Sequence, residues 1–143
     1  MSEHLTDPRP GILRKAVEVL QVNGRYIGDY YDLNQIDGDD DEPVHCRVCV
    51  LGAIALAAGC DLRNHSLGDP QTAAEDLAID AARALAWELH LLTDREDPNT
   101  VINVVANWHD GVDSREGHPS DAAVISALSH VADALERVAG EAR

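Results

Sequence analysis

The sequence predicts an all-α fold, a compact orthogonal bundle of about five helices. Apolar residues recur at spacings of three and four along most of the chain, as they do on the buried face of a helix. Alanine is abundant, phenylalanine is absent and aromatic residues make up only 3% of the chain, which favours closely packed helices. Residues 48–58 contain no polar side chain, which indicates a short apolar helix at the centre of the bundle.

The N-terminal part predicts a flexible leader over residues 1–8 and a single domain over residues 9–143. Asp7-Pro-Arg-Pro10 opens the first helix, because proline suits a first turn, and Gly24 ends it. The apolar face of this helix consists of Ile12, Leu13, Ala16, Val17 and Leu20.

The next stretch has a different character. Residues 26–33 contain all three tyrosines and predict an irregular or short β-like arm. Residues 37–42 form an acidic loop without the spacing of an EF-hand, because with Gly38 as the central glycine the twelfth position would be Val44. We therefore expect a solvated loop and no calcium site there.

Three further helices follow the central helix, which Gly59 ends. A long helix is expected over residues 71–92. Asn99 or Thr100 is expected to cap the fourth helix, which stops at Gly111, and Ser120 is expected to cap the fifth. The fifth helix has an apolar seam that fits packing inside the domain or against a second subunit: Val124, Leu128, Val131, Leu135 and Val138.

The net charge of −15 excludes a general nucleic-acid or anionic-membrane binder, since both need a basic surface. It fits a solvated acidic surface, a basic partner or a mimic of duplex DNA. The longest apolar run is too short to span a membrane, and the N-terminus resembles no signal peptide. Three cysteines without an export signal indicate free thiols in the cytoplasm.

Two short motifs carry a resemblance to a known family. Cys49-Val-Leu-Gly-Ala53 precedes a helix of small residues, and Trp108-His109-Asp110 stands where the family has Trp-Asn-Asp. On these motifs the chain resembles an uncharacterised small-domain family of actinobacteria and their phages, over roughly residues 11–135. The resemblance implies no activity, cofactor or partner.

The cysteines permit a metal site. His45, Cys46, Cys49, Cys60 and His65 are zinc-ligand types, and Cys46, Cys49, Cys60 and His65 would be the ligands of any such site. A helix between Cys49 and Cys60 would hold the two sulfurs about 16 Å apart, which is too far for one ion. We therefore expect no metal and no cofactor, with Cys49 as a small buried apolar residue.

A second hypothesis treats Cys49 as a nucleophile. In the first turn of the central helix, the dipole would lower the pKa of a thiol. His109 would then be the base, with Asp110 orienting it, as in Cys-His-Asp enzymes. No strand is predicted near His109 and no oxyanion hole is evident, so this hypothesis is an alternative.

Residues 108–110 also have a structural interpretation. Trp108 would belong to the core, Asp110 would cap the following turn, and a protonated His109 would be favoured by the helix dipole. A surface formed by Trp108 with Tyr26, Tyr30 and Tyr31 is a candidate binding site, because tyrosine is common at interfaces.

The function we expect is that of a non-enzymatic, cytoplasmic protein-interaction module, in which an acidic surface binds a protein partner with a basic surface. We expect no direct contact with nucleic acid or membrane, and a possible homodimer through the last helix. A thiol-dependent hydrolase or transferase using Cys49 and His109 is one alternative. A zinc-stabilised binding module is another.

Overall fold

The computed structural model describes residues 7–25, 48–60, 67, 70–92, 97–111 and 117–141. Within these ranges the chain forms five helices and no strand, so the predicted all-α class is confirmed: α1 (Arg9–Asn23), α2 (Val50–Ala58), α3 (Ala73–Glu88), α4 (Pro98–Asp110) and α5 (Asp121–Glu141). The predicted arm over residues 26–33, the acidic loop over residues 37–42 and the first six residues of the leader lie outside these ranges.

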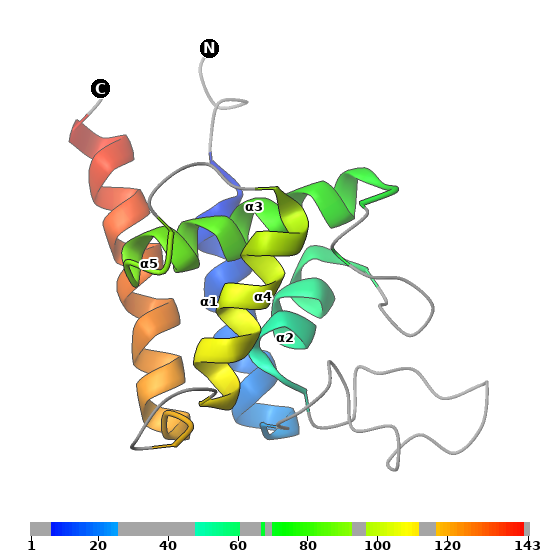
Figure 1. Ribbon diagram of the computed structural model, residues 1–143. Helices are drawn as coiled ribbons and strands as arrows, with labels where there is room; N and C mark the ends of the chain where they lie inside the picture. Colours follow the sequence, from blue (N-terminus) through cyan, green and yellow to red (C-terminus); the bar gives the residue numbers. More distant parts are fainter. Residues whose placement is uncertain are drawn as a thin grey trace.

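Helices α1 and α5 lie side by side and run in opposite directions, while α3 lies across the other helices (Figure 1). An ion-pair cluster joins α1 and α5. The guanidinium of Arg14 on α1 lies 2.6 Å from Asp133 and 2.9 Å from Glu136, both on α5. These three side chains are well exposed, so the cluster contributes little to stability.

Helix α2 contains no charged residue and is buried from Val50 to Ala55. It packs against α1, α3 and α4, and small residues in α2 allow this close approach. The helix begins two residues later than the apolar run, because Cys49 has an extended backbone and serves as the N-cap. The prediction that Cys49 lies in the first turn was therefore wrong by one position.

Helix α3 is shorter than the sequence predicts. A capping box starts it, since Thr72 accepts a hydrogen bond from the backbone N–H of Glu75 and the Glu75 carboxylate accepts one from Thr72. The helix ends at Glu88 instead of residue 92, because His90 adopts a left-handed backbone with φ of 60°.

The start of α4 also differs from the prediction. Asp97 is the N-cap instead of Asn99 or Thr100, and its carboxylate accepts a hydrogen bond of 2.9 Å from the Thr100 N–H. Pro98 then occupies the first helical position, where its missing N–H costs nothing. Asp97 and Pro98 together therefore begin the helix earlier than Asn99 or Thr100 alone would indicate.

Ser120 caps α5 as predicted, because its hydroxyl accepts a hydrogen bond from the Ala123 N–H. Three residues of the α5 seam, Val124, Leu128 and Val131, are buried within the single chain, whereas Val138 is exposed. The buried part of the seam therefore packs inside the domain. Among the helices described, none is long and apolar enough to cross a membrane.

Candidate functional site

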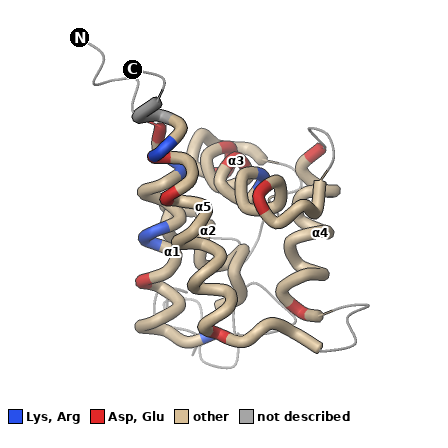
Figure 2. Tube along the Cα trace, turned by 90° about the vertical axis from the view of Figure 1, so that its left-hand side faces the viewer, with Lys and Arg blue, Asp and Glu red and all other residues tan. Residues whose placement is uncertain are grey.

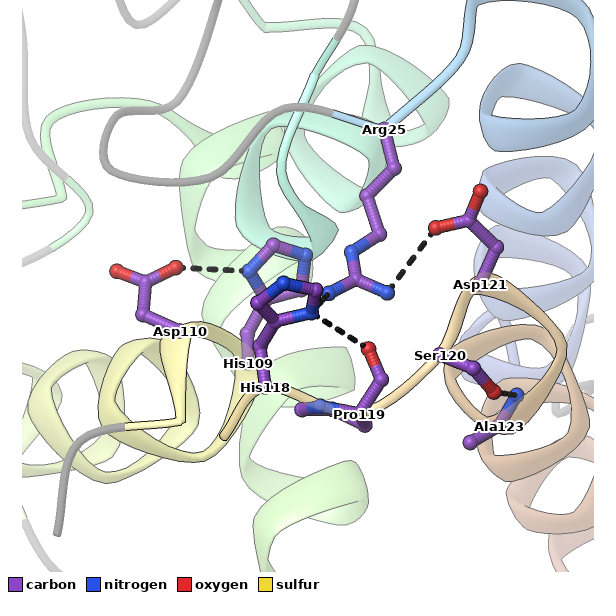
Figure 3. A network of polar contacts seen from close by, with 8 residues as sticks. All are labelled: Arg25, His109, Asp110, His118, Pro119, Ser120, Asp121 and Ala123. Carbon is purple, nitrogen blue, oxygen red and sulfur yellow. Dashed lines mark hydrogen bonds and ion pairs between the residues drawn. The ribbon is translucent and has the colours of Figure 1, made fainter. Parts of the chain in front are cut away.

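Polar side chains gather at the end of the bundle where α1 and α4 finish and α5 begins (Figure 3). We call Arg25, His109, Asp110, His118 and Asp121 the polar cluster. The start of α2 lies at the same end, because the Val48 N–H donates a 3.0 Å hydrogen bond to the Gly24 carbonyl and Val48 pairs with Arg25 in an isolated parallel bridge. Segments from the two halves of the chain therefore meet here.

Arg25 connects these segments. Its side chain is only 4% exposed, and its Nη1 donates to Asp121 at 3.1 Å while its Nη2 lies 3.1 Å from Nδ1 of His118. The partner carboxylate of Asp121 is 77% exposed, so the pair joins a buried cation to a solvated anion. This arrangement avoids the cost of burying both charges.

The contact between Arg25 and His118 indicates which nitrogen of the imidazole accepts a hydrogen bond. A guanidinium only donates hydrogen bonds, so Nδ1 of His118 must accept one and carry no proton. The same nitrogen lies 3.2 Å from the Pro119 carbonyl, a contact that would require Nδ1 to donate.

His109 lies in the last turn of α4 and is only 1% exposed. Its Nδ1 lies 2.9 Å from a carboxylate oxygen of Asp110. Burial lowers the pKa of His109, and the positive charge of Arg25 lowers it further, although the hydrogen bond with Asp110 acts in the opposite direction. The helix dipole would favour a protonated His109, but burial acts against the charged imidazole.

Because His109 is neutral, its Nδ1–H donates to Asp110 and its Nε2 is an acceptor. Among the residues that the structure describes, Nε2 of His109 and the Nε–H of Arg25 are buried without a hydrogen-bond partner. Figure 3 shows the Nε2 edge of the ring turned toward Arg25. One unmatched acceptor and one unmatched donor thus belong to the same cluster.

Cys49 lies outside this hydrogen-bond network, at the N-cap of α2. Its sulfur accepts a hydrogen bond from the Gly52 N–H at 3.4 Å, and the residue is 8% exposed. The interpretation of Cys49 as a buried structural residue agrees with both observations. Trp108 is partly buried and packs against the core, which agrees with its interpretation as a structural residue.

The metal and tyrosine hypotheses depend largely on residues outside the described ranges. Cys49 and Cys60 are not joined to each other by a disulfide, and no group of three or more metal-ligand side chains occurs in the part of the chain that the structure describes. Cys46, His65, Tyr26, Tyr30 and Tyr31 lie outside those ranges, so the zinc and tyrosine sites remain predictions.

Sequence reasoning missed Arg25, His118 and Asp121. Arg25 lies 93 positions from His118 and 96 positions from Asp121, and no periodicity connects them. Arg25 directly follows the glycine that ends α1, a position that carries no signal of a long-range contact.

The helices and the polar cluster define a small all-α domain with a buried arginine and histidine at one end. The chain belongs to a family of unknown function, DUF6197, which matches residues 5–134. No curated protein and no solved structure matches the chain significantly. The predicted membership in an uncharacterised domain family is thus confirmed.

Acidification should destabilise the fold through His109. Its pKa in the folded state lies below the ordinary value of 6.5, so between these values the unfolded chain binds more protons. The free energy of unfolding should therefore fall as the pH falls below 6.5, by up to about 1.4 kcal/mol per pH unit from this residue. Urea unfolding across this pH range measures the effect.

His109→Asn is the matched control. The asparagine amide can donate to Asp110 from nearly the same position as Nδ1, but it does not titrate. The variant should lose stability less steeply on acidification than the wild type. Equal slopes would show that His109 is not the group responsible.

Native Cys49 should react slowly with iodoacetamide near neutral pH. Because the thiol is buried at the N-cap, modification requires local opening of α2. We expect labelling at least about tenfold slower than in urea, measured by mass spectrometry of the peptide containing Cys49. Rapid stoichiometric labelling in the native protein would instead favour the nucleophile hypothesis.

Proposed function

We propose that this protein is a small acidic interaction module, non-enzymatic and cytoplasmic, that binds a partner protein through the partner's basic surface. One version is an actinobacterial or phage accessory protein that binds the basic face of a DNA-binding protein. Support comes from the net charge of −15 and from α3 and α5, each of which has four acidic residues against one arginine.

The observation that carries the proposal is that most of the described cations form ion pairs within the chain. In the described ranges four arginines form ion pairs with carboxylates of the same chain: Arg9, Arg14, Arg25 and Arg83. Lysine and arginine occur on α1, α3 and α5, whereas α4 has neither and contains Asp110 as its one acidic residue (Figure 2). The excess of acid is therefore left for the solvent or for a partner.

Calorimetric titration with a synthetic peptide of alternating Arg and Ala tests this function at about 0.15 M salt, where weak surface attraction is screened. We expect saturable binding, and no binding of the corresponding Glu-Ala peptide. Cys49→Ala should bind as the wild type does. Charge reversal of residues 37–42, or substitution of Tyr30 and Tyr31, should weaken binding. The absence of saturable binding would refute the proposal.

One observation favours a second candidate, a thiol-dependent hydrolase or transferase. The hydrogen bond between His109 and Asp110 leaves Nε2 of His109 available, which is the orientation that a general base requires. The burial and capping role of Cys49 argue against this candidate. The labelling rate of Cys49 decides between the two functions.

A further inference from the structure

Helix α3 has an aromatic residue on its outer surface. Trp87 is 53% exposed, although tryptophan is usually well buried. The other large hydrophobic residues exposed in the described ranges are valines, Val22 on α1 and Val138 on α5. Tryptophan is among the residues most enriched where binding energy concentrates at interfaces. Trp87 is therefore the strongest candidate contact on the described surface.

Two carboxylates share the helix face of Trp87. Asp76, Asp80 and Trp87 follow one another by four and seven positions, and at 100° per residue these spacings keep all three within a narrow stripe. The stripe is about 16 Å long at 1.5 Å per residue. Asp76 is exposed, and the side chain of Asp80 is 45% exposed.

Arg83 lies on the same stripe without cancelling its charge. It is largely covered, and its Nη1 donates a 3.0 Å hydrogen bond to Oδ1 of Asp80. A carboxylate has about four acceptor positions, so Asp80 retains capacity for a second donor. Arg9 of α1 also acts electrostatically on Asp80, but it is itself paired with Asp7, so the exposed carboxylate of Asp76 leaves the stripe acidic overall.

We propose that this outer face of α3, formed by Asp76, Asp80 and Trp87, is the docking surface for an arginine-bearing segment of a basic partner protein. The inference rests on the proposed function and names the place where the partner binds. A guanidinium stacks on the indole of Trp87 through cation–π attraction. A second arginine on the segment donates to Asp76 or Asp80 through its planar fork of N–H groups.

The charge of the chain argues for this occupant over the alternatives. A second copy would bring another charge of −15 and would place acidic stripes against each other. Nucleic acid is excluded by its own negative charge. A basic protein segment satisfies the carboxylates and the indole together. The remaining acidic surface then accelerates its approach.

The test is a titration of ¹⁵N-labelled protein, followed by NMR, with the Arg-Ala peptide and with a Lys-Ala peptide of equal length and charge. The indole N–H of Trp87 and the amides of Asp76 and Asp80 should shift most. The arginine peptide should bind more tightly than the lysine peptide. A planar guanidinium can stack on the indole and donate two parallel hydrogen bonds to one carboxylate, and an ammonium group cannot. Equal affinity for the two peptides would refute the arginine preference.

Matched variants locate the surface. Trp87→Ala should weaken binding of the arginine peptide about tenfold, and Asp76→Asn should weaken it measurably. Two controls remove the same chemistry elsewhere: Val138→Ala removes an exposed apolar side chain, and Glu18→Gln removes an exposed carboxylate. Both should change the affinity less than about twofold, as ordinary exposed substitutions do.

The outcomes separate this inference from the proposed function. If the wild type binds and the α3 variants bind equally well, the α3 surface is wrong and the basic-partner function stands. If the wild type binds no arginine peptide, both the proposed function and the docking surface on α3 are refuted. Circular dichroism of Trp87→Ala checks that the half-exposed substitution leaves the helices folded.

Discussion

Gly111→Ala should lower the free energy of unfolding by about 2–5 kcal/mol. Gly111 follows α4 in a left-handed conformation with φ of 74°, which costs an alanine about 1–2 kcal/mol. An added Cβ would also lie 2.2 Å from the backbone nitrogen of His118 and 2.3 Å from the carbonyl carbon of Gly117. Backbone atoms cannot move aside as a flexible side chain does, so overpacking adds about 1–3 kcal/mol.

Two other glycines separate these contributions. Gly59 ends α2 in the same left-handed region with φ of 92°, but a Cβ there meets no atom of the described residues within 4 Å, so Gly59→Ala should lose only the conformational part. Gly11 lies within α1 and is equally open, so Gly11→Ala should gain about 0.5–1 kcal/mol. Urea unfolding of the three variants measures the series. If Gly111→Ala and Gly59→Ala lost the same amount, the close approach of residues 117–118 would be refuted.

The close approach at Gly111 also bears on the polar cluster. It holds His118 beside the end of α4, and Arg25 then reaches His118 and Asp121 from the end of α1. Gly111→Ala should therefore disturb the Arg25 contacts as well as the turn. The pH dependence due to His109 provides a second readout, because loosening this end would expose the imidazole and return its pKa toward 6.5.

The sequence predicts those parts of this fold that depend on neighbours along the chain. The apolar run located α2, and the hydroxyl of Ser120 located the start of α5. Errors arose where two local signals competed, as at Asp97-Pro98, or where one residue adopted a rare backbone conformation, as at His90.

The candidate site was less predictable for a physical reason. The Asp110 partner of His109 is its sequence neighbour, and both residues were identified as candidates. Arg25 reaches its partners only after α1 and α5 have packed against each other, so no local pattern records the contact. The burial of His109, which makes its imidazole neutral, likewise depends on tertiary packing.

Ile54→Ala should lower the free energy of unfolding by about 2–5 kcal/mol, a large share of the roughly 5–15 kcal/mol typical of whole domains. Ile54 is fully buried in the middle of α2, which packs against α1, α3 and α4, so the cavity would open between several helices that cannot all close on it.

Two variants measure the dependence on buried volume. Ile54→Val removes one methylene and should cost about 0.5–1.5 kcal/mol. Val22→Ala removes an apolar side chain that is 84% exposed on α1 and should cost less than about 0.5 kcal/mol. Urea unfolding followed by circular dichroism ranks the three.

A loss below about 1 kcal/mol for Ile54→Ala would mean that the surrounding helices collapse onto the cavity and that α2 is not the rigid centre of the packing. If Ile54→Ala loses the expected stability but still binds the arginine peptide below its unfolding transition, Ile54 stabilises the fold without taking part in binding. The outer face of α3 would then be distinct from the residues that stabilise the core.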